Sequence, residues 1–246
     1  MNMRKILIMR DGKKFHLKNT NQDLHTEFGV IRKEVIKKAK NGEPLKSNTG
    51  KEFFAINPAF IDFYRRIKRD AQIIPLKDVG RIITEVGINK KSRILDAGSG
   101  SGALACFLGG IAKEVVTYEI RKDFIEIVNS NIELLGLGNV KVKNIDIYQN
   151  VEEKGMDIVT LDLPEPWNAL KSCSAALKAG GFVISYSPSV PQFMDFVSAI
   201  RKDEKFAYIK TVEIIEREWE VDERRVRPKN TGIFHSGFLS FARKIW

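Results

Sequence analysis

The sequence contains few of the residues that build metal centres and disulfide frameworks. Its 246 residues include only 3 histidines and 2 cysteines, Cys106 and Cys173. The two cysteines lack metal-ligand spacing and stand within apolar helical patterns, where a thiol usually acts as a small buried hydrophobe. His16 and His25 also have no partner at a ligand spacing. We therefore expect no metal, and we assign no chemistry to the thiols.

Long apolar runs and an excess of acidic residues are also missing. No apolar run approaches the roughly 20 residues that a membrane-spanning helix requires, and the N-terminus has no apolar segment ending in a small-residue cleavage site. Lys and Arg number 41 against 31 Asp and Glu, which gives a net charge of +10. Such a surplus attracts polyanions, either nucleic acid or an acidic membrane face. We expect a cytoplasmic protein without a membrane segment, and charge alone does not choose its partner.

Residues 1–66 have the pattern of a small, mostly β accessory domain. Two strand-like runs, residues 5–9 and 14–18, flank Asp11-Gly12. An Asp-Gly pair between two such runs is a strong hairpin signal. Turn-forming residues dominate 41–50, and apolar residues return over 60–67, which predicts a helical exit from this domain.

After Pro75 the patterns of helix and strand alternate. We expect strands at 93–96, 115–120, 140–144, 157–162 and 182–186, and helices at 77–86, 103–112, 122–135, 169–177 and 192–200. This alternation predicts a mainly parallel sheet covered by helices on both faces. Two further strand-like runs, 208–221 and 237–244, follow with no helix between them, which favours an antiparallel end. Residues 67–246 are therefore expected to form the Rossmann-like α/β domain of class I methyltransferases, a mainly parallel seven-stranded sheet with an antiparallel last strand.

The glycine-rich segment 94–103 predicts a cofactor site. Its glycines occupy every second position between an apolar strand and a helix, where the backbone must turn sharply and lie against a ligand. A dinucleotide fingerprint places its third glycine one residue later. A carboxylate at Asp96 suits the ammonium and sulfonium of S-adenosylmethionine and would repel a pyrophosphate. The expected cofactor is S-adenosylmethionine, released as S-adenosylhomocysteine, and its loop contacts are Asp96, Gly98, Ser99, Gly100, Ser101 and Gly102.

Acidic residues also follow the next two strands. Glu119 ends one of them, where a carboxylate can accept both ribose hydroxyls, as in other adenosine-binding α/β sheets. Asp146 follows the other and is a candidate acceptor for the adenine amino group. Solvated strand ends are the alternative interpretation of both residues.

A stiff loop, residues 162–167, follows the fourth strand and carries the most specific motif of the chain. Its sequence is Asp-Leu-Pro-Glu-Pro-Trp, and its two prolines restrict the backbone at the sheet edge where open α/β folds bind ligands. The segment resembles the DLPEPW motif of the tRNA (adenine-N1)-methyltransferases that modify the T-loop, at position 58 and in archaea also 57. Further segments resemble that family in the same order, at 72–74, 118–121, 217–221, 225–228 and 235–239.

The resemblance implies a homotetramer, a dimer of dimers, that binds tRNA and flips the target adenine out of the T-arm. Extrusion is required because a stacked base does not present N1 to a methyl donor. An anionic Asp162 accepting a hydrogen bond from N6 would stabilise the charge that develops on the base. The residues implied in addition are Gln72 and Asp162 at the cofactor, Tyr186 as the second catalytic residue, which holds the flipped base, and Trp167, Arg225, Arg227, Lys229 and His235 toward the RNA. A half-buried strand aromatic is the alternative interpretation of Tyr186, and a buried structural histidine is that of His235.

The chain departs from the family at Pro75-Leu76, where members often have Tyr-Pro. A tyrosine expected to line the acceptor pocket is therefore missing, which puts the pocket's shape and its preference between neighbouring adenines in doubt. The basic residues 224–229 are expected in a loop near the substrate edge, where they would contact phosphates. Arg65, Arg66, Lys68 and Arg69 are further candidates, with a solvated face as the alternative.

Three other functions are alternatives for this sequence. A class I methyltransferase acting on a small molecule, such as a corrin precursor, shares the glycine loop and the acidic strand end. A non-catalytic tRNA-binding subunit would not need the cofactor loop that this chain has. A nicotinamide dehydrogenase is disfavoured by the glycine spacing and the antiparallel end.

Overall fold

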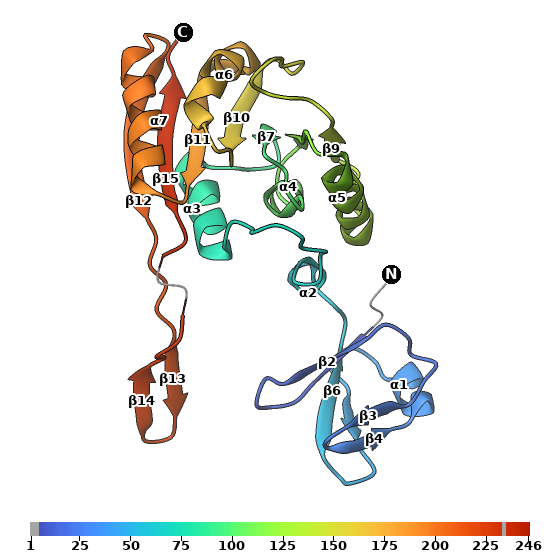
Figure 1. Ribbon diagram of the computed structural model, residues 1–246. Coiled ribbons are helices and arrows are strands. Elements are labelled where there is room, and N and C mark those ends of the chain that lie inside the picture. The colour runs from blue at the N-terminus through green and yellow to red at the C-terminus, as the bar shows by residue number, and fades with distance from the viewer. Residues whose placement is uncertain (1–4, 233–234) are drawn as a thin grey trace. The chain divides into compact units, whose positions relative to one another are not determined.

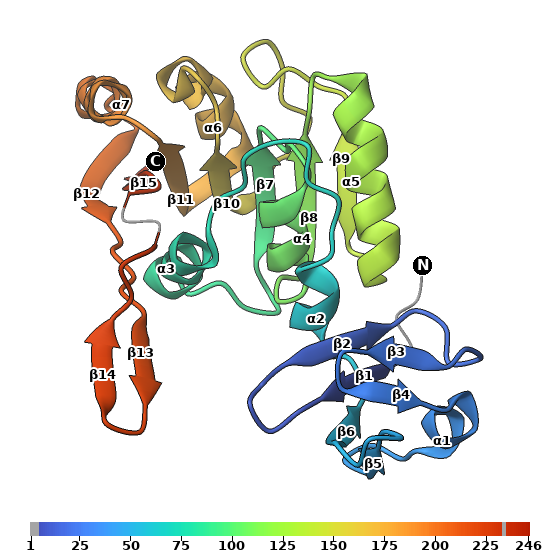
Figure 2. The same cartoon turned by 60° about the horizontal axis from the view of Figure 1, so that its bottom comes forward.

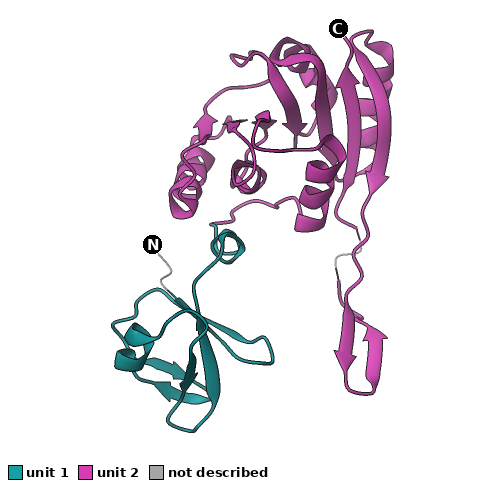
Figure 3. Ribbon diagram, turned by 180° about the vertical axis from the view of Figure 1, so that it is seen from behind, with its two compact units in different colours: residues 1–67 teal, residues 68–246 magenta. Residues whose placement is uncertain are grey.

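The computed structural model describes residues 5–232 and 235–246. The chain separates into two compact units, Met1–Ile67 and Lys68–Trp246 (Figure 3). The boundary expected from the sequence, after residue 66, lies one residue before this division.

The first unit is built on a four-stranded antiparallel sheet. Its strand order is β2-β1-β6-β5, with bounds β1 Lys5–Ile8, β2 Lys14–Leu17, β5 Pro44–Lys46 and β6 Glu52–Ile56. The hairpin predicted at Asp11-Gly12 is confirmed, because Ile8 pairs with Lys14 and Gly12 has a φ of +86°. A second hairpin, β3 (Leu24–Thr26) with β4 (Gly29–Ile31), and two short helices, α1 (Lys33–Lys38) and α2 (Phe60–Tyr64), complete the unit.

The second unit contains a seven-stranded sheet (Figure 1). Its strand order is β12-β15-β11-β10-β7-β8-β9, and β15 runs antiparallel to both of its neighbours while the other pairs of adjacent strands are parallel. This confirms the predicted mainly parallel sheet with an antiparallel last strand. The bounds are β7 Arg93–Ala97, β8 Glu114–Tyr118, β9 Val140–Lys143, β10 Met156–Leu161, β11 Leu177–Ser187, β12 Phe206–Glu213 and β15 Phe238–Lys244.

Helices cover both faces of this sheet (Figure 2). Neighbouring strand residues divide between two apolar clusters: Ile94 packs with α3 and α4, whereas Leu95 packs with α6 and α7. Strands buried on both faces need near-continuous apolar runs, which is why their patterns are readable in the sequence. The helices are α3 Leu76–Val86, α4 Ala103–Gly109, α5 Lys122–Leu135, α6 Leu170–Ala176 and α7 Val190–Lys202, with a 3-10 turn at Pro166–Ala169.

The C-terminal region differs from the prediction at two places. The run expected as one strand, 208–221, is interrupted after β12, and the expected loop 224–229 is mostly strand. β13 (Trp219–Asp222) and β14 (Arg225–Pro228) form a hairpin, which is a sheet of its own and which we call the arm. Its two-residue turn contains Glu223, whose φ is +35°. The usual glycine or asparagine turn signal is absent there, so sequence pattern alone did not reveal the hairpin.

Membrane-spanning helices and metal clusters are both missing from residues 5–232 and 235–246. No helix in that part of the chain is long and apolar enough to cross a membrane. No cluster of His, Cys, Asp and Glu in the same residues has the arrangement of a metal site.

Candidate active site

A cavity of about 380 Å³ opens at the carboxyl ends of β7, β8 and β10 in the second unit. The strand order changes direction around β7, and ligands of open α/β sheets bind at such a switch point. The residues predicted for the cofactor that line this cavity are Gln72, Gly98, Gly100, Glu119, Asp146 and Asp162. Apolar side chains complete the walls: Ile120, Ile145, Ile147 and Leu163.

Gly98 brings two loops of the site into direct contact. A Cβ atom at this position would lie 2.0 Å from the backbone oxygen of Asp162, and the φ of Gly98 is +88°. The amide of Asp162 donates to Ala97 O at 2.9 Å, which closes the loop after β10 onto the end of β7. Only glycine fits this contact, so the glycine-rich loop after β7 and the loop after β10 meet at one backbone junction.

Gly102 is the N-cap residue of α4 and lies close to α5. Its φ is +73°, and a Cβ there would lie 2.9 Å from Cγ1 of Val128 on α5. The amides of Gly98 and Ser99 both donate to Tyr118 O, at 3.1 and 3.2 Å. The loop is therefore held against the end of β8 and against α5.

Glu119 presents its carboxylate in the cavity wall. The residue is buried, with 6% of its surface exposed. Its Oε2 accepts from the amide of Gly100 at 2.9 Å, and its Oε1 accepts from the amide of Arg121 at 3.0 Å. Each oxygen keeps a further lone pair, so the carboxylate can accept two hydroxyl donors from a bound ribose.

Asp96 lies inside the sheet and is not a cavity-lining residue. Its two carboxylate oxygens accept hydrogen bonds from Thr117 Oγ1 at 2.6 Å and from Thr160 Oγ1 at 2.7 Å. Burial raises the pKa of Asp96, and the charge of Glu119 raises it further. The carboxylate thus joins β7 to both neighbouring strands, and its direct contact with the cofactor stays a prediction.

The two loop serines also direct their side chains away from the cavity. Ser99 Oγ lies 2.5 Å from Thr117 Oγ1 and donates to Tyr118 O at 3.1 Å. Ser101 Oγ accepts from the amide of Asp70 at 3.1 Å. Both side chains stabilise the shape of the loop, so a contribution of Ser99 and Ser101 to the ligand would come through the backbone.

Asn131 is a structural residue of the site that the sequence analysis missed. It is fully buried on α5, and its Nδ2 donates to Lys68 O at 3.0 Å and to Ser101 O at 2.8 Å. Its Oδ1 accepts from the amide of Lys68 at 2.8 Å. These bonds fix the segment that leads to Ala71 and Gln72 in the cavity wall. The sequence signal for this role is that Asn131 lies three residues after Val128, which places a polar side chain on the apolar face of the helix.

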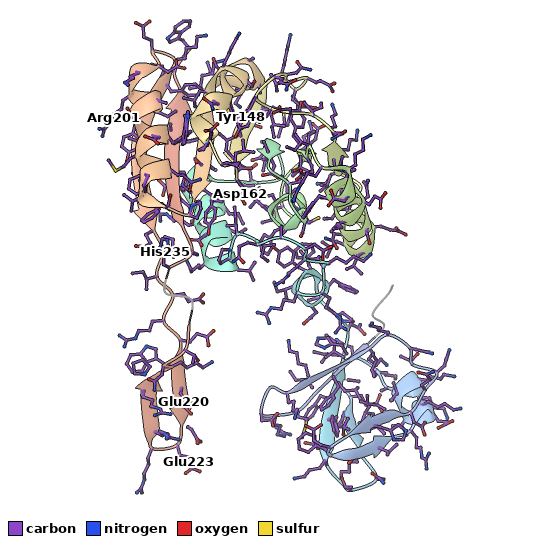
Figure 4. All side chains as sticks on the ribbon, viewed as in Figure 1. Tyr148, Asp162, Arg201, Glu220, Glu223 and His235 are labelled. Carbon is purple, nitrogen blue, oxygen red and sulfur yellow. The ribbon has the colours of Figure 1, made fainter. Side chains whose placement is uncertain are left out.

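Asp162 stands just beyond the end of β10 (Figure 4). Burial raises the pKa of its carboxyl group to about 7, and the negative charge of Asp96 contributes to that shift. A carboxyl group with this pKa changes charge near neutral pH, as acid-base groups of active sites commonly do.

Asp146 and Tyr148, on the loop that follows β9, also line the cavity. Asp146 Oδ1 accepts from the amide of Tyr148 at 2.9 Å. The Tyr148 hydroxyl accepts from the amide of Glu165 at 3.3 Å, so it links the loop after β9 to the loop after β10. Tyr148 lines the cavity and was also missed, because an aromatic residue after a strand has no distinctive pattern.

Tyr186, Trp167 and His235 are not among the cavity-lining residues. Tyr186 is 8% exposed and donates to Ser236 O at 2.6 Å. Burial raises its pKa to about 12. Trp167 packs against the apolar cluster of α6 and α7. The predicted contact of Tyr186 with the flipped base and the predicted contact of Trp167 with the RNA stay predictions.

His235 lies on the segment that leads into β15 (Figure 4). It contacts two hydrogen-bond acceptors. Its Nδ1 is 2.6 Å from Glu213 Oε1, and its Nε2 is 3.0 Å from Pro188 O. Two acceptors favour the doubly protonated ring, and the hydrogen bond with Glu213 is the main reason that the pKa of His235 is raised. The pair joins the end of β12 to the segment before β15.

The predicted RNA-binding residues Arg225, Arg227 and Lys229 lie on or beside β14. Arg227 forms an ion pair with Glu220 at 2.8 Å, and Lys229 forms one with Glu218 at 2.5 Å. Arg225 has no ion pair within the described parts of the chain. The arm has two chemically different faces, because the paired residues Trp219–Pro228 and Val221–Val226 alternate with the charged pairs along it.

The cavity suits a ligand that combines an adenosine with a cationic tail. Glycine backbone leaves room along one wall, isoleucines offer apolar surface for a base, and Glu119 can bind the ribose hydroxyls. The remaining carboxylates, Asp146 and Asp162, give the cavity an acidic character that favours a cation. The residues present thus fit S-adenosylmethionine.

The chain also resembles known tRNA methyltransferases in sequence. Residues 64–237 match the family model described as the tRNA methyltransferase complex GCD14 subunit. The chain is 33% identical to the tRNA (adenine(57)-N(1)/adenine(58)-N(1))-methyltransferase TrmI of Methanocaldococcus jannaschii, over 97% of this chain and 94% of the relative.

Two solved structures also resemble the chain closely. The tRNA (m1A58) methyltransferase TrmI from Aquifex aeolicus has a TM-score of 0.84 and 28% identity, covering 99% of this chain and 97% of that one. A SAM-dependent O-methyltransferase from Thermotoga maritima has a TM-score of 0.87 and 29% identity, with coverage of 99% and 93%. These likenesses confirm the expected class I S-adenosylmethionine-dependent methyltransferase fold.

Proposed function

Because this chain belongs to the tRNA methyltransferase complex GCD14 subunit family, we propose that it transfers a methyl group from S-adenosylmethionine to N1 of an adenine in tRNA. The observation that carries the proposal is Asp162 in the wall of the cofactor cavity, joined to the glycine loop through Gly98. We propose adenine 58 as the target and adenine 57 as a second one, since the archaeal relative's name gives both positions.

In this proposal the cavity residues bind and orient the cofactor. Glu119 accepts hydrogen bonds from the ribose hydroxyls, and Asp146 accepts one from the adenine amino group. Gln72 and the glycine backbone enclose the cationic tail of the cofactor. Bound S-adenosylmethionine supplies a methyl group already activated by its positively charged sulfur. The chain therefore contributes mainly position, which accounts for a large part of the acceleration in two-substrate reactions.

The acceptor chemistry is assigned to Asp162. Adenine N1 has its own lone pair, so no strong base is needed to form the nucleophile. As N1 gains the methyl group, the base becomes cationic, and an anionic Asp162 accepting a hydrogen bond from N6 stabilises that charge. A cofactor cation in the same cavity favours the anionic form of Asp162.

We further propose a homotetramer, a dimer of dimers, acting on tRNA in the cytoplasm. Support comes from the two faces of the arm: Trp219, Val221 and Val226 are exposed, apolar and suited to a second copy, while the opposite face is charged. In this arrangement residues 1–66 form the accessory domain and residues 67–246 the catalytic domain.

The decisive experiment is transfer of labelled methyl from S-adenosylmethionine to an unmodified tRNA transcript, followed by mapping of the product nucleoside. We expect 1-methyladenosine in the T-loop. Transfer to a small molecule instead, to an oxygen or a corrin-type acceptor, would overturn the tRNA proposal. Cofactor binding without any transfer would support a subunit that needs an active partner.

Charge on the arm should control tRNA affinity. Replacing Arg225 and Arg227 together with glutamine is expected to raise the KM for tRNA and to reduce the salt dependence of binding by roughly one power of salt for each phosphate that is no longer neutralised. The measurement is tRNA binding over a series of salt concentrations.

Glu220→Gln is the matched control, because it removes the carboxylate that pairs with Arg227. Its tRNA affinity should equal or exceed that of the unaltered protein. An unchanged salt slope in the double arginine variant would remove the arm from the RNA interface.

A further inference from the structure

A buried ion pair stands at the start of α3, outside the residues assigned above. Asp78 is fully buried, and the Lys77 side chain is 7% exposed. Lys77 Nζ lies 2.9 Å from Asp78 Oδ2 and 3.1 Å from Oδ1. Removing both charges from water is costly, so such a pair is a weak source of stability and calls for another explanation.

The same pair holds both ends of the segment that carries the arm. Lys77 Nζ donates to Ile214 O at 2.6 Å, and Ile214 directly follows β12. Lys77 Nζ also donates to Ser236 Oγ at 2.6 Å, and Ser236 Oγ donates to Asp78 Oδ2 at 2.7 Å. Ser236 lies two residues before β15. The chain leaving the sheet toward the arm and the chain returning from it are thus bound to one pair of charges.

Ser236 connects this pair to Tyr186, the predicted second catalytic residue. Its hydroxyl is bound by Lys77 and Asp78, while its carbonyl oxygen accepts a hydrogen bond from the Tyr186 hydroxyl at 2.6 Å. The Tyr186 ring also packs tightly on Gly237, where a Cβ would lie 2.6 Å from ring carbon Cζ. A displacement of Ser236 would therefore move the hydrogen-bond partner and the packing surface of Tyr186 together.

We propose that Lys77 and Asp78 are positioning residues for methyl transfer, which act through Ser236 to keep the arm and Tyr186 in register with Asp162. The inference rests on the proposed function, because it assumes that tRNA is the acceptor. A buried, hydrogen-bonded ion pair suits this role, since its contacts are directional and not easily exchanged with water. Small misplacement of an acceptor is enough to slow a reaction that depends on orientation.

The test replaces the pair as a unit, with Lys77→Met/Asp78→Leu, so that no single buried charge is left without a partner. We expect a folded protein with S-adenosylmethionine affinity within about twofold of the original and a kcat on tRNA lower by about tenfold or more. Ser236→Ala should lower kcat in the same direction, and Ser236→Thr, which keeps a hydroxyl, should restore part of it.

The diagnostic readout is the thermodynamic cycle between these variants. If the pair acts through Ser236, adding Ser236→Ala to the double variant causes no further decrease in kcat, because the hydroxyl is already without its partners. Additive decreases would mean that the pair and Ser236 act independently. A purely structural role would instead lower the folding stability and the S-adenosylmethionine affinity together with kcat. The control is Arg81→Met on the same helix: Arg81 pairs with Glu85, which keeps Lys210 as a partner, and its kcat should not change.

Additive decreases, or a stable double variant with the original kcat, would overturn the inference. If the double variant does not fold, Ser236→Ala decides alone, and an unchanged kcat in it would equally overturn the inference. Failure of the original protein to methylate tRNA is a different outcome, since it would refute the proposed function itself.

Discussion

Replacing Asp162 with alanine is expected to lower the rate of methyl transfer to tRNA by about a thousandfold. The variant lacks the carboxylate that stabilises the cationic base, while Glu119 and the glycine loop remain to bind the cofactor. The measurement is a single-turnover rate at saturating cofactor and tRNA, together with the S-adenosylmethionine dissociation constant. A variant that binds cofactor and retains the original rate would refute the assigned role.

The pH dependence of the rate tests the same assignment. The pKa of Asp162 is raised to about 7, so the carboxyl group is neutral below that pH and anionic above it. Because the anion is the active form, kcat/KM for S-adenosylmethionine, measured at low cofactor concentration, should rise with pH and level off above about 7. Asp162→Asn should remove this rise. Asp146→Asn, a change in the same cavity, should weaken cofactor binding and leave the shape of the profile unaltered.

The raised pKa also has a consequence for stability. An unfolded chain ionises Asp162 near its ordinary value of 3.8, whereas the folded chain does so near 7. The original protein therefore loses stability relative to Asp162→Asn as the pH rises between these two values. Above the higher value the difference in unfolding free energy between the two proteins is constant. Thermal unfolding of both proteins across this range measures the effect, and a constant difference throughout would contradict the shift.

Gly98→Ala is expected to weaken cofactor binding strongly for a geometric reason. The added Cβ would lie 2.0 Å from Asp162 O, and the φ of +88° is unfavourable for alanine. The strain should cost about 1 kcal/mol and the clash a further ~1–3 kcal/mol. Since the loops after β7 and β10 must separate, S-adenosylmethionine affinity should fall by about a hundredfold. Equilibrium dialysis and chemical unfolding measure the two effects.

Gly136→Ala is the matched control for this prediction. Gly136 ends α5 with a φ of +66°, and a Cβ there meets no atom within 4 Å in the described structure. It should therefore show only the backbone cost of about 1 kcal/mol and normal cofactor affinity. Equal weakening of cofactor binding in both variants would mean that general destabilisation, and not the junction with Asp162, explains the result.

Several features of this site depend on partners that sequence spacing does not reveal. Asp96 stands opposite Thr117 on one neighbouring strand and Thr160 on the other. A carboxylate at the end of a strand suggests a ligand contact until the sheet order shows that both oxygens already have donors. Ser99 and Ser101 are similar cases, because their acceptors and donors come from β8 and from the segment before Gln72.

The arm and the ion pair at α3 show the same limit over longer separations. Lys77 and Ser236 are 159 residues apart, and no local pattern connects them. The arm's turn has no glycine, and within the described residues its two strands pair only with each other. Its alternating residues therefore resembled a continuation of β12 followed by a basic loop.

The sequence by itself determined the α/β class, the order of strands and helices in the domain of the seven-stranded sheet, the glycine loop and the motif at 162–167. These features depend on spacing within short segments, where apolar periodicity and glycine conformations are local properties. Tertiary structure decided which polar groups reach the cavity and which are bound within the sheet. That outcome depends on strand order and on contacts between distant segments, because a buried carboxylate or hydroxyl must find its partner wherever the fold brings one.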